Sequence, residues 1–355
     1  MLLFVVAGCT AFQLEDSSIA EMQDNKLEVA AVEMLAKPKD STLLNSDESI
    51  ETQVKLGRGM NIGNALESPR YINWGVEMKY EYFDTIKEAG FDTVRLPVRF
   101  SDYSHHENGI LEDVFIEKID AYINYALDLG LLLILDFHHF EEIKSNPEGE
   151  KERFISIWSQ LAERYKDYPN RLVFELLNEP KDNLSGDVWN LYIQEAVSVI
   201  RETNPARLII VGGAPYNSVE SLETLSLPND ENLVVTFHYY APAEFAFQGN
   251  PYHAGYEDLH SIKWTATEEE VNRLRTDFSK VRDWAKENNV DVFLGELGIV
   301  KTVPFEYRSK WTKAVIDTAE EMGFSWAYWE LASHFGIFDA ETFEWDVDML
   351  NILIK

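Results

Sequence analysis

The feature that most constrains the fold of this chain is an alternation of short apolar runs with longer amphipathic stretches, repeated eight times after residue 55. Short apolar runs are typical of strands buried in a parallel sheet, and apolar residues at steps of three and four are typical of helices. The expected strands are residues 59–63, 93–97, 131–137, 172–177, 208–211, 233–237, 292–295 and 325–328. The expected helices are residues 80–89, 115–129, 150–165, 188–203, 268–288 and 307–322, with a short one near 219–225 and a terminal one at 346–354.

Eight strand–helix units predict an α/β fold of one kind, a (β/α)8 TIM barrel that forms a single domain over residues 55–355. A barrel of this type takes about 250 residues, which fits within that span. An open, doubly wound sheet is the alternative, but such a sheet rarely needs eight units.

The residues before position 55 have a different composition. Residues 10–54 contain ten acidic residues and three lysines, with no glycine, tryptophan or tyrosine. They offer little for a core, so we expect an acidic, largely disordered tether. Residues 1–9 form an apolar run ending in Val-Ala-Gly-Cys, which resembles the lipobox where bacterial lipoproteins are cleaved and lipidated. We therefore expect a lipid on Cys9 and export, either to the cell surface or outer membrane or by secretion. The alternative is a buried or incidental cysteine. The run also lacks the lysine or arginine that usually precedes it in a signal.

Charge and motifs disfavour several classes of function. The formal net charge of -31, from 62 acidic and 31 basic residues, lacks the basic footprint that nucleic-acid binding requires. No glycine-rich phosphate loop follows the last two strands, and no lysine stands at a strand end to form a Schiff base. His138 and His139 are adjacent, so on a strand they would point to opposite faces and not share one metal ion. We expect no cofactor, no metal and no nucleic-acid partner, and we expect a monomer.

Polar side chains follow most of the expected strands. In a barrel of parallel strands, the chemistry lies at the carboxyl ends, where these side chains would meet at one mouth. Burying so many polar groups is costly unless they have a purpose. The residues concerned are Arg95, His138, His139, Asn178, Glu179, His238, Tyr240, Glu296, Trp329 and Glu330.

Two of these residues suggest a reaction. Hydrolysis of a glycosidic bond needs one carboxylic acid to protonate the leaving oxygen and one carboxylate to attack or to activate water. Glu179 and Glu296 follow the fourth and seventh strands, which lie across the mouth from each other. We expect a carboxyl separation of roughly 5 to 5.5 Å, the geometry of retaining enzymes, with Glu179 as acid/base and Glu296 as nucleophile. The charge of Glu296 should raise the pKa of Glu179 and keep it protonated until Glu296 becomes an ester.

The other polar groups have expected roles around this pair. Arg95 should hold Glu296 ionised, and Tyr240 should donate a hydrogen bond to it. Asn178 should bond the 2-hydroxyl of the sugar, and Trp329 should form the floor beneath the sugar ring. The two remaining groups, His138 and His238, should hydrogen-bond the substrate or the carboxylates.

Together with the opening stretch 57–67, these residues resemble glycoside hydrolase family 5 of clan A, across essentially all of residues 55–355. The likeness is strongest to bacterial endo-β-1,4-glucanases, in a branch that includes dual glucanase/mannanase enzymes. The resemblance implies the same roles for the two glutamates. It also implies that Asn64, Glu67, His139 and Glu330 line the glycone side. Leu297 stands where a Phe or Trp is common, and we expect it to point away from the sugar.

The function expected from these features is retaining, endo-acting cleavage of β-1,4-glucosidic bonds in cellulose-like or mixed-linkage β-glucan. An endo-β-1,4-mannanase or a dual enzyme is the alternative within the class. A non-catalytic, glycan-binding surface lipoprotein is the alternative outside it. Arg99 and Asp102 are interpreted as structural ion-pair partners. Six aromatic residues in loops are candidates for stacking on sugars: Trp74, Phe247, Tyr252, Trp264, Phe335 and Trp345.

Overall fold

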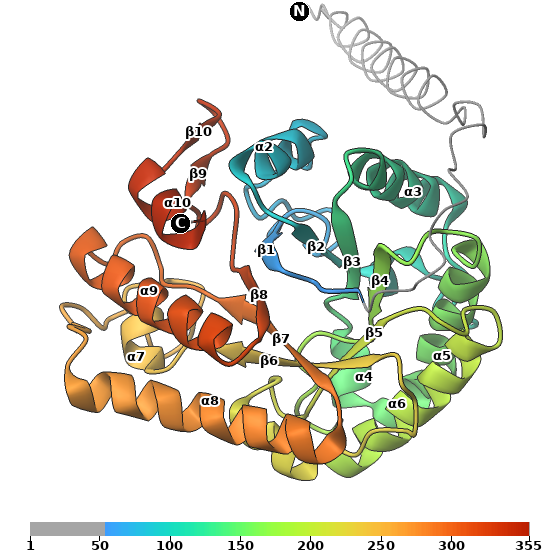
Figure 1. The fold of residues 1–355 in the computed structure, drawn as a ribbon. Coiled ribbons are helices and arrows are strands. Elements are labelled where there is room, and N and C mark those ends of the chain that lie inside the picture. The colour runs from blue at the N-terminus through green and yellow to red at the C-terminus, as the bar shows by residue number, and fades with distance from the viewer. Residues whose placement is uncertain (1–53, 355) are drawn as a thin grey trace, which may run out of the picture.

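The computed structural model describes residues 54–354 and shows a closed barrel of eight parallel strands in sequence order (Figure 1). The first strand pairs with both the second and the eighth, which closes the barrel. The strands are β1 (Arg58–Asn61), β2 (Thr93–Val98), β3 (Leu132–Phe137), β4 (Leu172–Glu175), β5 (Ile209–Gly212), β6 (Leu233–Tyr239), β7 (Asp291–Leu297) and β8 (Ser325–Tyr328). The expected (β/α)8 barrel is confirmed, and the open sheet is excluded.

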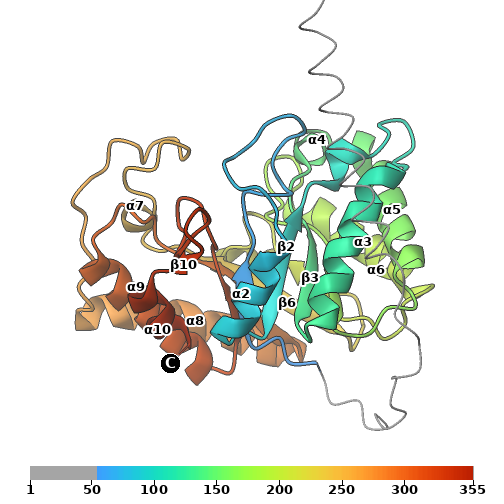
Figure 2. The same cartoon turned by 90° about the horizontal axis from the view of Figure 1, so that it is seen from above.

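Helices follow the strands and surround the barrel (Figures 1 and 2). The long ones are α2 (Glu81–Ala89), α3 (Asp113–Asp128), α5 (Pro147–Arg164), α6 (Gly186–Arg201), α8 (Glu268–Asn288), α9 (Phe305–Glu321) and α10 (Val347–Ile354). The short ones are η2 (Phe100–Tyr103), α4 (Glu141–Ser145), η3 (Val219–Thr224) and α7 (Ala243–Ala246). All eight expected helices are present, within a few residues of the expected ends.

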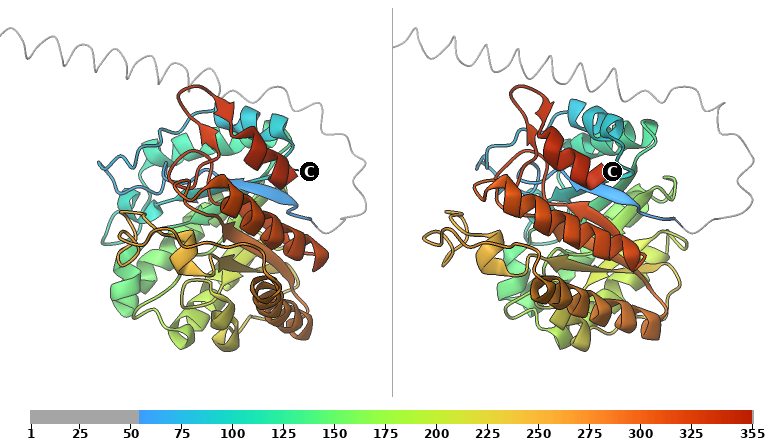
Figure 3. Two further views of the ribbon diagram at one scale, coloured as in Figure 1. Left: turned by 90° about the vertical axis from the view of Figure 1, so that its left-hand side faces the viewer. Right: turned by 60° about the vertical axis from the view of Figure 1, so that its left-hand side comes forward.

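The sequence missed one small element. After β8, two short antiparallel strands, β9 (Phe338–Asp339) and β10 (Glu344–Trp345), form a hairpin before α10. Two-residue strands leave no periodic pattern to detect in a sequence. The hairpin leads α10 back beside α9 and the start of β1, where Arg58 donates a hydrogen bond to the carbonyl of Ile354 (Figure 3).

The barrel interior has an apolar layer below a polar layer, because successive strand residues alternate between inside and outside. On β3, Ile134 belongs to the small interior cluster, whereas Leu133 and Leu135 belong to the larger core. Asp136, two residues after Ile134, therefore also faces inward, and it is fully buried. The same step of two leads on β4 from Val173 in the apolar layer to Glu175 in the polar one.

Two register shifts occur next to the polar layer. The pairing of β6 with β7 shifts between Phe237 and His238, and that of β7 with β8 shifts between Leu294 and Leu297. Such irregularities redirect side chains and are common beside active sites. Here the first shift places His238 opposite Glu296.

A hollow of about 1150 Å³ lies at the other end of the barrel, near Val54, Lys87 and Trp326. It is remote from the polar layer, because it lies at the beginnings of the strands.

Residues 1–9, Cys9 and nearly all of the expected tether fall outside the described residues. Within residues 54–354, no helix is long and apolar enough to cross a membrane.

Candidate active site

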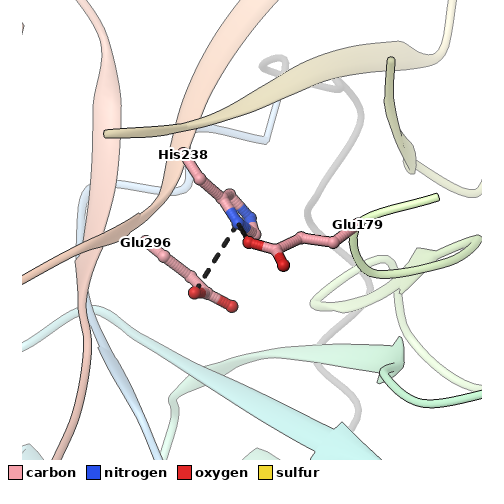
Figure 4. Close-up of side chains that lie close together, drawn as sticks. All are labelled: Glu179, His238 and Glu296. Carbon is pink, nitrogen blue, oxygen red and sulfur yellow. Dashed lines mark hydrogen bonds and ion pairs between the residues drawn. The ribbon is translucent and has the colours of Figure 1, made fainter. Parts of the chain in front are cut away.

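Glu179, His238 and Glu296 converge at the carboxyl end of the barrel (Figure 4). They come from the loop after β4, from β6 and from β7 respectively. One carboxylate oxygen from each glutamate and one ring nitrogen of His238 all lie within 4.8 Å of one another. Oxygens this close fit carboxyl groups about 5 to 5.5 Å apart, as in retaining glycosidases, better than the roughly 6.5 to 9.5 Å of inverting ones. The side chain of Glu179 is 28% exposed and that of Glu296 only 6%, so Glu179 is the carboxyl group more open to solvent.

Arg95 organises the buried side of this cluster. Its Nε and Nη2 donate to the two oxygens of Glu175, at 2.7 and 2.8 Å, and its Nη1 donates to Glu296 at 2.9 Å. Asp136 completes the ion pairs at 3.0 Å. Burial opposes the charge of Arg95, but the surrounding carboxyl groups outweigh it, and the pKa of the guanidinium is raised. The predicted contact between Arg95 and Glu296 is present.

Glu296 has a second predicted partner. The hydroxyl of Tyr240 donates to Oε2 of Glu296 at 2.7 Å, so each carboxylate oxygen of Glu296 accepts one hydrogen bond. Burial nevertheless raises the pKa of Glu296, and the neighbouring charge of Glu179 acts in the same direction. The cations around it and the Tyr240 hydrogen bond lower the pKa and limit that rise.

The pKa of Glu179 differs from the expectation. Burial acts to raise it, but the hydrogen bond with Nδ1 of His238, at 2.9 Å, and the charge of that ring outweigh burial, and the pKa is lowered. Burial lowers the pKa of His238, but both glutamates outweigh this effect and raise it. The prediction that the charge of Glu296 raises the pKa of Glu179 is therefore wrong, since the net shift is downward. The expected hydrogen bond of His238 to a carboxyl group is present, but the prediction for Glu179 left out the effect of that bond on its pKa.

His138 belongs to a neighbouring part of the site. Its Nδ1 contacts Asp136, not the two catalytic candidates, and burial lowers its pKa. Its ring stacks on Trp329 at a centroid distance of 5.3 Å and an angle of 4°. A Cβ on Gly63 would lie 2.8 Å from the Trp329 ring, so glycine at this position leaves room for the indole.

Asn178 is buried beside this network. Its side-chain oxygen accepts a hydrogen bond from Nη2 of Arg95 at 2.9 Å, which fixes the orientation of the amide and leaves its NH2 group as the donor. Its backbone N–H bonds to the carbonyl of Phe137. The predicted contact of Asn178 with the sugar remains a prediction.

The residues expected on the glycone side differ in burial and in hydrogen-bond partners. Glu67 and Glu330 are buried, and each accepts hydrogen bonds from backbone N–H groups of its own loop, including those of Asn64 and Ser333. Burial raises the pKa of Glu67 to about 8 and that of Glu330 to about 7. His139 is partly exposed and lies 3.4 Å from Glu141.

Two of the six candidate aromatic residues are buried, and a third is half-buried away from the mouth. Trp264 and Phe335 are buried, and Trp345 packs against Phe91 and Phe338, away from the mouth. A stacking role for Trp345 was wrongly expected, because the hairpin that carries it folds back toward α2. The other three candidates, Trp74, Phe247 and Tyr252, are only partly buried or exposed.

Two further expectations concern residues outside the reacting groups. Arg99 and Asp102 form the predicted ion pair, with a long N–O distance of 3.7 Å. Leu297 is fully buried in the core, so it points away from the mouth, as expected.

Glu179, His238 and Glu296 also have the spacing of a possible metal site. Arg95 already supplies positive charge to Glu296, and the hydrogen bond between Nδ1 of His238 and Glu179 accounts for the short distance between those two groups. We therefore interpret the trio as two carboxyl groups bridged by an imidazole.

Several residues of the site were not identified from the sequence. Asn61 accepts from Arg95 and donates to the carbonyls of Gly295 and Tyr328. Glu175 holds Arg95 from the strand before Glu179. Its position, two residues after Val173 on an inward face, was the available signal. Asn217, which contacts His238, lies in a loop and left no periodic signal.

A family model described as cellulase, glycosyl hydrolase family 5, matches residues 53–335. The chain belongs to glycoside hydrolase family 5. This confirms the family expected from the sequence and makes the chain a glycosidase of the retaining type.

Two curated relatives of this chain are named endoglucanases. Endoglucanase H of Acetivibrio thermocellus is 32% identical over 309 residues, which cover 85% of this chain and 33% of that protein. The chain thus spans about a third of the length of that relative. Endoglucanase A of Ruminococcus albus is 27% identical, over 85% of this chain and 91% of its own.

Solved structures of the family superimpose closely. Subunit Z of the clostridial cellulose synthase from Clostridioides difficile is 52% identical, with a TM-score of 0.84, covering 85% of this chain and all of that one. Cel5A of Thermotoga maritima is 42% identical, with a TM-score of 0.82, covering 84% of this chain and 97% of its own. That protein has been solved with cellobiose and with mannotriose.

Replacing Tyr240 with phenylalanine tests the electrostatics of this site. Loss of the hydroxyl removes a hydrogen bond that favours ionised Glu296, so the pKa of Glu296 rises. Because the enzyme needs ionised Glu296, the acidic limb of the kcat/KM profile then moves to higher pH. Tyr239→Phe is the matched control, since the Tyr239 hydroxyl bonds to Asp277 outside the barrel. An acidic limb that moves equally in both variants, or in neither, contradicts the assignment.

Proposed function

We propose that the protein is an endo-acting β-1,4-glucanase in which Glu296 is the nucleophile and Glu179 the acid/base. The observation that supports this most is a pair of carboxyl groups with one oxygen of each within 4.8 Å of the other. One carboxyl group is buried and held by Arg95 and Tyr240, and the other is more exposed. In this arrangement Arg95 and Tyr240 hold Glu296 for attack on the sugar, and the more exposed Glu179 protonates the leaving oxygen.

The reaction proceeds in two displacements. Glu296 attacks the anomeric carbon and forms an ester, while the glycosidic C–O bond breaks and Glu179 gives its proton to the leaving oxygen. Water then attacks the anomeric carbon, whose bond to the oxygen of Glu296 breaks; the proton of the water passes to Glu179, and Glu296 is released as a carboxylate. Asn178 donates its amide to the 2-hydroxyl, and Trp329 forms the floor beneath the reacting ring.

Separate alanine variants distinguish the two roles. Glu296→Ala abolishes turnover of every glucoside, because no ester forms. Glu179→Ala lowers kcat/KM on β-glucan by about 10²- to 10⁴-fold, the usual contribution of a general acid. With 2,4-dinitrophenyl β-cellobioside, whose leaving group needs no proton, the same variant retains a burst of product.

Glu320→Gln is the control for this experiment, since Glu320 pairs with Arg58 at the opposite end of the barrel. Its activity should equal that of the unmodified protein. If wild type and Glu296→Ala both bind glucan and neither hydrolyses it, the enzyme proposal fails and the glycan-binding alternative holds.

We propose β-1,4-glucan as the preferred polymer. The alternative is that the enzyme is an endo-β-1,4-mannanase or a dual glucanase/mannanase. The curated relatives support glucan, and the Cel5A structures with two kinds of sugar support a dual activity. Rates on carboxymethylcellulose, barley β-glucan, glucomannan and mannan, measured side by side, should be highest on the first two. A higher kcat/KM on mannan overturns the preference.

A second candidate role is action on cellulose made by the producing cell. It is favoured by the 52% identity to a cellulose synthase subunit that the chain covers completely. Attachment through Cys9 would hold the enzyme at the surface where such a polymer emerges. If Cys9→Ala leaves the full chain in the membrane fraction, the lipid-anchor proposal is wrong. All described site residues come from one barrel, so we propose that the enzyme acts as a monomer.

A further inference from the structure

Asn217 lies behind His238, on the side of the ring away from the two glutamates. Its side-chain nitrogen is 3.4 Å from Nε2 of His238, and its backbone carbonyl accepts the N–H of His238 at 2.8 Å. The residue is fully buried in the loop between β5 and η3. It therefore contacts the ring nitrogen that the carboxyl groups leave free.

Two glycines make room for this contact. A Cβ on Gly212, at the end of β5, would lie 2.1 Å from Oδ1 of Asn217. A Cβ on Gly295, in β7, would lie 3.0 Å from Nε2 of His238 and 2.6 Å from the hydroxyl of Thr236. Asn217 itself has a φ of 48°, a left-handed conformation that asparagine and aspartate tolerate better than other side chains.

The reaction needs a proton on Glu179, but the neighbouring charges lower the pKa of Glu179 and raise that of His238, which favours the proton on the ring. Nδ1 of His238 lies 2.9 Å from Glu179 and 3.6 Å from Glu296. These carboxylates attract a second proton onto the ring, which would leave Glu179 ionised and unable to act as an acid. Other charged or titratable groups also act on this cluster: Arg95 on β2, His138 and His139 after β3, Lys144 on α4, Tyr240 after β6, and His253 in the loop after α7.

We propose that Asn217 is a positioning residue that donates its amide N–H to Nε2 of His238 and so keeps the shared proton on Glu179. With Nε2 occupied as an acceptor, the ring is neutral and carries its hydrogen on Nδ1, directed at the carboxyl groups. A doubly protonated ring would point an N–H at the N–H of Asn217, which is unfavourable unless the amide rotates. This inference rests on the acid role proposed for Glu179 and adds the group that makes that role available.

Asn217→Asp tests the proposal with almost no change in shape. A carboxylate can only accept at this position, so it stabilises protonated Nε2 and draws the shared proton from Glu179 onto His238. We expect kcat/KM on β-glucan to fall by about 10²-fold, as for the loss of general acid catalysis. We expect kcat/KM on 2,4-dinitrophenyl β-cellobioside to remain near the wild-type value, because its leaving group needs no acid and ionised Glu179 still serves as base.

Asn190→Asp is the matched control, since Asn190 is another buried asparagine, bonded to Thr224 and Ser226 far from the reacting groups. It should change stability without changing the ratio of the two activities. An Asn217→Asp variant that loses both activities equally, or neither, overturns the proposal. The acid role of Glu179 is overturned instead if Glu179→Ala gives no burst of product from 2,4-dinitrophenyl β-cellobioside.

Nitrogen-15 NMR of the His238 ring in the unmodified enzyme gives a test that needs no variant. We expect a protonated Nδ1 and an unprotonated Nε2 at the pH of maximal activity. If both ring nitrogens carry hydrogen at that pH, the amide of Asn217 is rotated with its oxygen toward the ring, and the proposal is wrong.

Discussion

The site depends on a buried cation, the guanidinium of Arg95. It contacts Asp136, Glu175 and Glu296, and it also holds the side chains of Asn61 and Asn178. A charge buried without partners costs many kcal/mol, and removing one partner of a buried ion pair typically costs about 3 to 5 kcal/mol. The orientation of the proposed nucleophile and the folding of the upper barrel are therefore coupled through one side chain.

The barrel makes such a charge cluster possible by separating two layers. Ile134, Val173 and Phe293 fill the lower interior with apolar side chains, and Asp136 and Glu175 continue the same inward faces two residues later. The apolar layer keeps water away from the base of the polar one, which strengthens every hydrogen bond within it. Catalytic groups can then be held rigidly by strands, while loops are left to contact the polymer.

The position of the proton is the remaining requirement of the chemistry. The charges of Glu179 and Glu296 act on each other, and His238 lies between them and acts on both. The imidazole makes Glu179 a weaker holder of the proton than a two-carboxylate picture suggests. A neutral amide behind the ring, supplied by Asn217, offers a way to reverse this preference without adding charge to the site.

The sequence alone determined the barrel, because eight apolar runs separated by amphipathic stretches leave few other ways to bury their surfaces. It also predicted that Glu179 and Glu296 lie at the same mouth and that Arg95 and Tyr240 contact Glu296, since the carboxyl ends of the strands meet there. Only the tertiary structure decided the partners that act across the barrel: Glu175 and Asn61 on Arg95, His238 between the carboxyl groups, and Asn217 behind His238. Those contacts join residues far apart in the chain at distances near 3 Å. Strand periodicity gives the face on which a residue lies but not the atom that it contacts. The pKa of Glu179 is lowered by one such contact, the hydrogen bond with His238, which periodicity alone does not give.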